Sequence, residues 1–255
     1  MSTYELIKSI PYSLSRPSLC TFDLYIPEQN PTGSLIIYFV GGGLKKCNKN
    51  AQPLPPALAD LGYAVAVPEY RIFPEAKYPQ FITDAAEAVC AVLTEIKNRT
   101  DAIKNVYIGG HSAGAYLSMM LAFDERYLGR HGIPTDLAAG YLFLSGQPTK
   151  HFSVLESEGR DKTDIVVDDT APLYHLPESG RSVPPMLVVS SNRDMAARLE
   201  QNLLLCASLR ARGHKDAVTF VNLGDYGHGE MVREVPGKGI PVLRVIDEFI
   251  TATAK

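Results

Sequence analysis

The stretch Asn105-Val-Tyr-Ile-Gly-Gly-His-Ser-Ala-Gly114, followed directly by Ala115-Tyr-Leu-Ser-Met-Met-Leu-Ala122, decides the fold of this chain. An apolar run typical of a buried strand leads into Gly-His-Ser-Ala-Gly, and a run with helical character follows at once. A turn this sharp accepts only glycine on either side of the serine, and it places the serine hydroxyl at the open edge of a sheet. The pattern therefore predicts Ser112 as a nucleophile, with a purely structural turn as the alternative.

Strand-like and helix-like segments alternate on both sides of this turn. Continuous apolar runs predict strands that are covered on both faces, and apolar residues at helical spacing predict helices. Helices of about ten or more residues between strands favour parallel pairing through right-handed crossovers, whereas the first two strands read as an antiparallel hairpin. We expect an α/β fold with a mostly parallel sheet of about eight strands and helices on both faces. The expected strands cover residues 4–10, 19–26, 34–40, 63–67, 106–108, 140–144, 186–190 and 217–223, and the expected helices cover 53–61, 78–97, 113–123, 196–211 and 240–251.

The domain organisation follows from length and regularity. The 255 residues are enough for one α/β domain and few for two. No repeat, low-complexity tract or linker is visible, so we expect a single domain over residues 1–255. Residues 147–185 are the least regular stretch, and a connection this long inside a compact domain is usually functional or mobile. A small lid would sit there.

Composition argues against several classes of partner. The net charge is −3, and acidic and basic residues are interspersed, so neither a nucleic acid nor a membrane surface is an expected partner. No apolar run approaches the roughly 18 residues that span a bilayer. The first residues lack the pattern of a secretory signal, and the four cysteines form no C-x-x-C pair, so we expect a cytoplasmic location. A homodimer remains open.

A nucleophilic serine needs a base within hydrogen-bonding reach and an acid that orients the base. In this kind of fold the partners follow the serine in the order acid, then histidine, each after a strand. His228 lies in a glycine-rich loop directly after the strand expected at 217–223, and it is the predicted base. The other histidines lie inside the turn, before any plausible acid, in the irregular stretch, or at a helix end: His111, His131, His151, His175 and His214.

Asp194 is the predicted acid because it follows the buried strand expected at 186–190. Its rival, Asp225, shares a loop with His228 and would leave Asp194 without a role. Asp194 could also cap the helix expected at 196–211, and the two roles are compatible.

An oxyanion hole requires backbone N–H groups that face the developing negative charge. One should come from Ala113, the residue after the serine, and others from the loop that follows the strand expected at 34–40. That loop reads Val40-Gly-Gly-Gly-Leu44, and successive glycines let the backbone approach a substrate closely. A merely flexible turn is the alternative.

These residues resemble the α/β-hydrolase superfamily, and within it the hormone-sensitive-lipase-like esterases, from Ser34 to the end of the chain. Pro68-Glu-Tyr-Arg-Ile-Phe-Pro-Glu75, with Tyr78-Pro and Asp84 downstream, looks like that group's Y-R-L-x-P-E segment, which implies a brace beneath the glycine loop. Ala171-Pro-Leu and Val183-Pro-Pro-Met-Leu-Val-Val look like the approach to the strand that bears the acid.

The resemblance implies an α/β-hydrolase fold with a minimal lid and a triad of Ser112, Asp194 and His228, with Gly42, Gly43 and Ala113 as oxyanion donors. The chain departs from the group's usual H-G-G-G, because Val40 replaces the histidine that commonly braces the loop, which predicts a looser or re-routed loop. The glycine motif also begins only 40 residues into the chain, which favours open pockets and small or polar esters.

The expected function is a serine hydrolase that cleaves short-chain carboxylic esters through an acyl-enzyme on Ser112, with acetylated sugars or other small acetyl esters as candidate substrates. No metal or organic cofactor is implied. The main alternative is a catalytically weak hydrolase fold that binds a small molecule, and Val40 is the feature in its favour. Formamide or amide hydrolysis and a peptidase are lesser alternatives.

Overall fold

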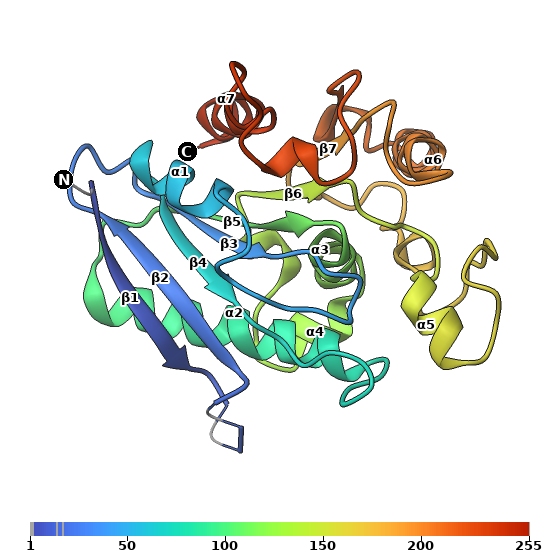
Figure 1. Cartoon of the computed structure of the whole chain (residues 1–255), viewed down its shortest axis with the longest axis horizontal. Helices are drawn as coiled ribbons and strands as arrows, with labels where there is room; N and C mark the ends of the chain where they lie inside the picture. The colour runs from blue at the N-terminus through green and yellow to red at the C-terminus, as the bar shows by residue number, and fades with distance from the viewer. Residues whose placement is uncertain (1–2, 14, 17, 255) are drawn as a thin grey trace.

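One eight-stranded sheet organises the computed structural model, which describes residues 3–13, 15–16 and 18–254 (Figure 1). The strand order is β1-β2-β4-β3-β5-β6-β7-β8. The pairs β1/β2 and β2/β4 are antiparallel, and all later pairs are parallel. The predicted fold class and leading hairpin are confirmed. The strands are β1 (Tyr4–Pro11), β2 (Thr21–Pro27), β3 (Ser34–Phe39), β4 (Ala64–Pro68), β5 (Asn105–His111), β6 (Gly140–Leu144), β7 (Met186–Ser190) and β8 (Val218–Asn222).

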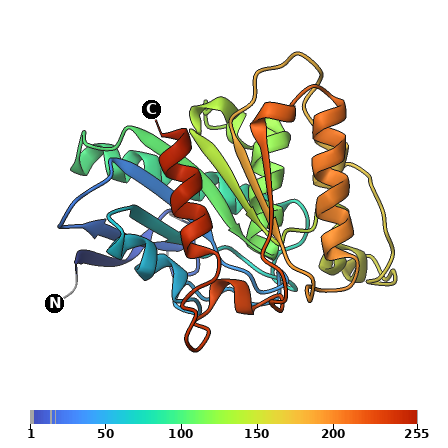
Figure 2. The same cartoon turned by 90° about the horizontal axis from the view of Figure 1, so that it is seen from above.

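Helices cover both faces of the sheet, as predicted. α1 and α7 contact each other on one face, and α2, α3 and α6 pack on the other; Figure 2 shows α7 running across the sheet and α6 beyond β7 and β8. α6 and α7 begin two and three residues later than expected. The helices are α1 (Leu54–Asp60), α2 (Gln80–Arg99), α3 (Ala113–Phe123), α4 (Glu125–Gly129), α5 (Phe152–Ser157), α6 (Arg198–Ala211) and α7 (Leu243–Thr253).

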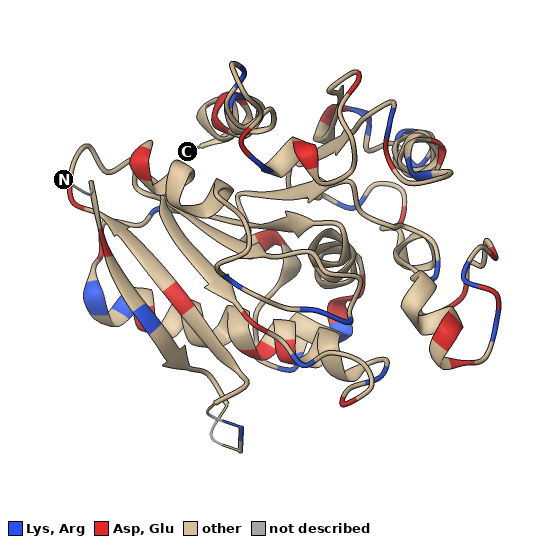
Figure 3. Ribbon diagram, in the orientation of Figure 1, with Lys and Arg blue, Asp and Glu red and all other residues tan. Residues whose placement is uncertain are grey.

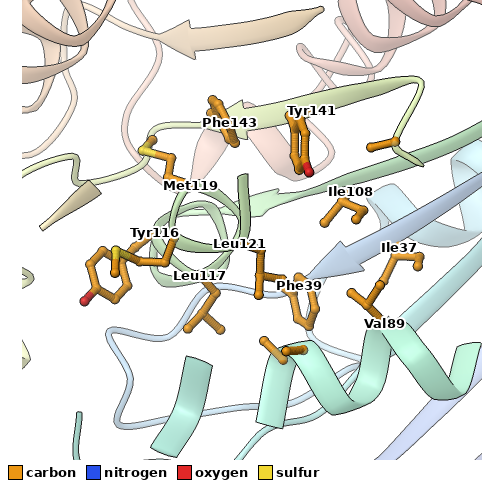
Figure 4. Packing of buried hydrophobic residues seen from close by; sticks show 14 of the residues in the cluster. Ile37, Phe39, Val89, Ile108, Tyr116, Leu117, Met119, Leu121, Tyr141 and Phe143 are labelled. Atoms are coloured by element: carbon orange, nitrogen blue, oxygen red, sulfur yellow. The ribbon is translucent and has the colours of Figure 1, made fainter. Parts of the chain in front are cut away.

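The β5–α3 unit lies at the centre of this arrangement. β5 pairs with β3 on one side and β6 on the other, so both of its edges are hydrogen-bonded. α3 carries no charged residue and ten of its eleven residues are buried, because it is enclosed between the sheet and α2. In Figure 4, Leu117 and Leu121 lie near Phe39, while Met119 lies near Phe143. Ser112 therefore stands on a rigid support at the carboxyl end of the central strands, where α/β sheets bind their ligands.

The irregular stretch at 147–185 contains α5 and a 3₁₀ turn over Pro172–His175. Its first part is cross-linked by Lys150, whose buried ammonium lies 2.9 Å from Glu158 and 2.7 Å from Asp168. These contacts fold the stretch back on itself at the side of the sheet. Its action as a lid, and the single-domain assignment, stay predictions.

Figure 3 shows residues of both charge signs spread over helices, strands and loops. Within the described residues, no helix combines the length and hydropathy needed to cross a membrane.

Candidate active site

The turn between β5 and α3 has the geometry that its glycines predicted. Ser112 has φ 56° and ψ −115°, a conformation that non-glycine residues seldom adopt. A Cβ atom at Gly110 would lie 2.4 Å from the Phe39 carbonyl oxygen, and one at Gly114 would lie 1.9 Å from it. No larger residue fits at either position. The backbone N–H of Ser112 donates to Leu144 O at 2.9 Å, which ties the turn to the end of β6.

The structure brings Ser112, His228 and Asp194 together from three separate loops. His228 Nε2 lies 2.8 Å from Ser112 Oγ, and His228 Nδ1 lies 2.6 Å from Asp194 Oδ1. An ionised carboxylate only accepts hydrogen bonds, so Nδ1 carries the proton and Nε2 is left to accept from the serine hydroxyl. The arrangement is that of a hydroxyl joined to a base that a carboxylate orients.

The carboxylate of Asp194 is held by more than the histidine. Ser145 Oγ donates to Oδ2 at 2.6 Å, Ser190 Oγ donates to the same oxygen at 3.3 Å, and the N–H of Met195 donates to Oδ1 at 2.7 Å. Burial by itself would raise the pKa of Asp194, but hydrogen bonds from His228 and Ser145 and the other favourable interactions outweigh it, and the pKa is lowered. The acid is therefore kept ionised.

These contacts bear on two alternatives that the sequence leaves open, an N-cap role for Asp194 and the rival Asp225. The N-cap hypothesis for Asp194 is wrong, because α6 begins at Arg198 and its N-cap is Ala197 in a left-handed conformation. The loop between β7 and α6 is longer than the periodicity indicated. Asp225 accepts from the Asn192 side chain instead of lying at the histidine.

Sequence reasoning missed Ser145, the residue directly after β6. It is fully buried, has φ 51°, and also lies 2.8 Å from His228 Nδ1. Its place after a buried strand adjacent to β5 was an available signal, because the carboxyl ends of neighbouring parallel strands meet at one edge of the sheet.

His111, which the sequence does not favour as the base, lies beside His228 and contacts its backbone. Its Nε2 lies 2.8 Å from the carbonyl oxygen of His228, so Nε2 carries the proton, and its ring lies 4.7 Å from the His228 ring. Nδ1 then accepts from Gln52, whose side-chain oxygen accepts from Tyr38. Burial first, and the neighbouring His228 second, lower the pKa of His111 to about 3. A neutral, buried imidazole thus supports the backbone of His228.

The glycine loop provides the expected free donors. In the described part of the chain, the backbone N–H groups of Gly42, Gly43 and Ala113 make no hydrogen bond to the protein. A Cβ atom at Gly42 would lie 2.0 Å from Lys46 O, so the loop can take this path only with glycine there. Both loop glycines have positive φ values, 152° and 62°.

The brace that Val40 cannot provide comes from Tyr70, in the segment that follows β4. Tyr70 OH donates to the carbonyl oxygen of Val40 at 2.9 Å, and both residues are buried. Arg71 holds Asp84 on α2 through side-chain hydrogen bonds of 2.8 and 2.7 Å. Val40 in place of the motif's histidine predicts a looser or re-routed loop. In the structure, the hydroxyl of Tyr70 anchors the loop at Val40.

A pocket of about 290 Å³, the side pocket, lies between the irregular stretch and the start of α6. It borders the site at two points, because Phe152 packs against Gly43 and the N–H of Met195 binds Asp194. Among the described residues, no group of three or more His, Cys, Asp or Glu is placed to hold a metal ion. The side pocket is lined by Gln147, Phe152, Lys162, Thr163, Asp164, Ile165, Met195, Ala196, Ala197, Arg198 and Gln201.

The strand order, the crossovers and the turn after β5 define the class of fold: the chain has the α/β-hydrolase fold. A family model described as BD-FAE matches residues 22–139. The chain is similar to a truncated carbohydrate esterase from gut microbiota over 99% of this chain and 97% of the other, with a TM-score of 0.78 and 19% identity. It is similar to esterase 2 of Thermogutta terrifontis with bound propionate over 99% and 95%, with a TM-score of 0.75 and 19% identity.

Two curated relatives share sequence with part of the chain. A probable isoprenylcysteine alpha-carbonyl methylesterase of Arabidopsis thaliana is 30% identical over 105 residues, which are 40% of this chain and 25% of that protein. Kynurenine formamidase of Danio rerio is 27% identical over 122 residues, which are 47% of this chain and 40% of that protein. The matched region therefore spans less than half of each relative.

Proposed function

We propose that this protein is a serine carboxylic ester hydrolase in which Ser112, His228 and Asp194 form the catalytic triad. The observation that carries the proposal is the pair of short contacts that joins the Ser112 hydroxyl to His228 and His228 to a buried, ionised Asp194. A binding module needs neither this relay nor a serine held in a strained turn. Relatives and fold neighbours named as esterases support the same chemistry.

The proposed reaction has two halves. Ser112 Oγ attacks the ester carbonyl carbon while His228 Nε2 takes the hydroxyl proton, and the carbonyl oxygen becomes an oxyanion bound by the N–H groups of Gly42, Gly43 and Ala113. The intermediate collapses, the C–O bond to the alcohol breaks, and His228 returns the proton to the leaving alkoxide. Water then attacks the acyl-enzyme with the same base and acid, which releases the carboxylic acid and restores the serine.

We propose short acyl groups for the substrate. The side pocket, which Phe152 lines next to Gly43, has a volume of about 290 Å³, at the small end of the range for small-molecule pockets. Acetylated sugars and other small acetyl esters are the substrates we propose, and the fold neighbour named as a carbohydrate esterase agrees with this choice. We place the activity in the cytoplasm, because the four cysteines are free.

A formamide hydrolase is the second candidate, and the partial sequence match to kynurenine formamidase favours it. The same groups would serve, because attack on a formyl carbon produces the same kind of oxyanion and His228 would protonate the leaving amine.

Hydrolysis of p-nitrophenyl esters from acetyl to octanoyl, of acetylated sugars and of an aryl formamide would test the proposal. We expect the highest kcat/KM with acetyl or propionyl esters. Ser112→Ala should abolish turnover, while Ser118→Ala, which removes another buried hydroxyl of the same helix unit, should not. A fluorophosphonate probe should add to the wild-type chain at Ser112, as read by peptide mass. Full turnover by Ser112→Ala, or an unlabelled serine in the folded protein, would contradict the mechanism.

A further inference from the structure

Arg198, the first residue of α6, is a buried cation with few hydrogen bonds. Only 3% of its surface is exposed, and it lines the side pocket. Nη1 donates to the carbonyl oxygen of Ser145 at 2.7 Å, but Nη2 has only long contacts, 3.4 Å to Gln147 Oε1 and 3.9 Å to Met195 Sδ. Nε has no partner. A guanidinium group offers five N–H donors, so most of this capacity is unused.

The charge of Arg198 also lacks a counterion. In the described part of the chain, no carboxylate oxygen lies within 4.0 Å of its guanidinium nitrogens, whereas buried Lys49 and Lys150 are each paired with two carboxylates. Burial lowers the pKa of Arg198 to about 10, with Asp194 opposing the shift, so the group is charged at neutral pH. Burying an unpaired charge is costly, and buried charges in natural proteins are therefore usually paired.

The rest of the side pocket fits a short chain with a polar end. Phe152, Ile165 and Met195 provide apolar surface, and Ile165 and Met195 are 60% and 41% exposed at the rim. The unused Nε and Nη2 atoms form one edge of the guanidinium fork, which matches the two oxygens of a carboxylate. Met195 covers this edge, and an unbranched methionine side chain yields easily.

We propose that the side pocket binds a carboxylate at the end of the ester substrate and that Arg198 determines this specificity. The inference rests on the proposed esterase function and specifies its substrate class: small esters with an anionic group on the acyl or the alcohol side. Met195 moves aside, and Nε and Nη2 of Arg198 each donate a hydrogen bond to one oxygen of the carboxylate. The ester carbonyl then lies toward Gly43, next to Phe152.

Two pairs of substrates test this proposal, each with one charged and one neutral member of similar length. Monomethyl glutarate and methyl valerate place the charge on the acyl side, and the acetyl ester of 3-hydroxypropionate and propyl acetate place it on the alcohol side. In at least one pair we expect kcat/KM to be about 10-fold or more higher for the charged ester, because a hydrogen bond to a charged group contributes enough free energy for a difference of this size. A ratio of one or less in both pairs overturns the proposal.

Three variants separate specificity from structure. Arg198→Met should lower the charged-to-neutral ratio by about 10- to 100-fold, whereas a purely structural arginine would lower both rates equally and leave the ratio unchanged. Gln201→Glu keeps Arg198 but adds a carboxylate to the side pocket, and it should lower the ratio as well. Arg210→Met removes an exposed charge from the same helix and should leave the ratio as in the wild type. An unchanged ratio in both Arg198→Met and Gln201→Glu contradicts the inference.

Binding to the inactive Ser112→Ala protein separates this inference from the proposed function. Calorimetry should detect monomethyl glutarate or the charged acetyl ester with higher affinity than its neutral partner, and Arg198→Met in the same background should remove the difference. If no ester of either charge is hydrolysed, the proposed function fails while the binding result still stands. If neutral esters are hydrolysed but the charged ligand gains no affinity, the inference alone fails.

Discussion

Removing the Ser145 hydroxyl should weaken catalysis without touching the triad itself. In Ser145→Ala, Asp194 Oδ2 loses its 2.6 Å hydrogen bond and keeps only the 3.3 Å contact from Ser190. The other carboxylate oxygen still accepts from His228 and from a backbone N–H. The carboxylate is then free to rotate about its remaining contacts, and the histidine is less well oriented for the serine.

The magnitude follows from the type of bond that is lost. A hydrogen bond to a charged group contributes about 1.5–3 kcal/mol, and a factor of ten in rate corresponds to about 1.4 kcal/mol. If the whole contribution of the Ser145 bond appeared only in the transition state, kcat/KM would fall about 10- to 100-fold. Because the bond also stabilises the free enzyme, we expect about a 10-fold loss, mainly in kcat. Ser190→Ala removes the longer contact to the same oxygen and should cost less than about 3-fold.

The pH dependence of stability adds a second measurement. The Ser145 bond helps to lower the pKa of Asp194, so the variant has a higher carboxyl pKa. An aspartate with a lowered pKa stabilises the fold above the pKa of the unfolded chain, and this contribution is lost as pH falls through the folded pKa. In the variant this contribution should therefore be smaller, and its loss on acidification should be complete at a higher pH than in the wild type. Steady-state kinetics and thermal unfolding measure both effects. Wild-type kcat in Ser145→Ala, or a larger loss in Ser190→Ala, would refute the reasoning.

Three further predictions concern the groups around the triad. His111→Phe keeps a ring beside His228 but removes the hydrogen bond to its carbonyl oxygen, and we expect about a 10-fold loss of kcat in p-nitrophenyl acetate hydrolysis. The pKa of His111 is about 3 in the folded protein, so between about pH 6.5 and 3 the unfolded chain binds a proton that the folded chain does not. The free energy of unfolding therefore decreases as the pH is lowered through this range. Thermal melts of His111→Phe should show a smaller decrease in stability over the same range. Gly42→Ala would place a methyl group 2.0 Å from a backbone oxygen, and kcat should fall by about 100-fold or more while circular dichroism is unchanged. Tyr70→Phe removes the anchor of Val40 and should lower stability to urea by about 1 kcal/mol and kcat by a few-fold; unchanged values in both measurements would show that the loop does not need it.

Much of the fold was predictable because its signals are local. Continuous apolar runs marked the buried parallel strands, and apolar residues at helical spacing marked α2, since burial on one or two faces leaves a direct trace in the order of residues. The first and last residues of the strands and helices were predicted less accurately. β5 extends from Asn105 to His111, whereas the sequence predicts a strand only at 106–108. The glycines of β5 have a weak strand preference, and they adopt strand conformation because they pair with β3 and β6.

The candidate site also has a part that was predictable from local sequence and a part that was not. The turn around Ser112 was predictable because the steric demand for glycine acts on adjacent residues, and His228 and Asp194 were predictable from their places after strands. The start of α6 was not, since a left-handed Ala197 follows no local preference. The hypothesis that Asp194 caps this helix failed for that reason.

The sequence by itself determined the strand-turn-helix around Ser112, the order of serine, acid and histidine, and the glycine loop, because each depends on the conformations open to a few neighbouring residues. Only the tertiary structure decided what surrounds them. It set Ser145 against Asp194, His111 against the backbone of His228, and Tyr70 under Val40, and it left Arg198 buried without a counterion in the described part of the chain. Hydrogen bonds and charges of this kind join residues that are distant in the chain, and their strength depends on burial, which no local pattern encodes.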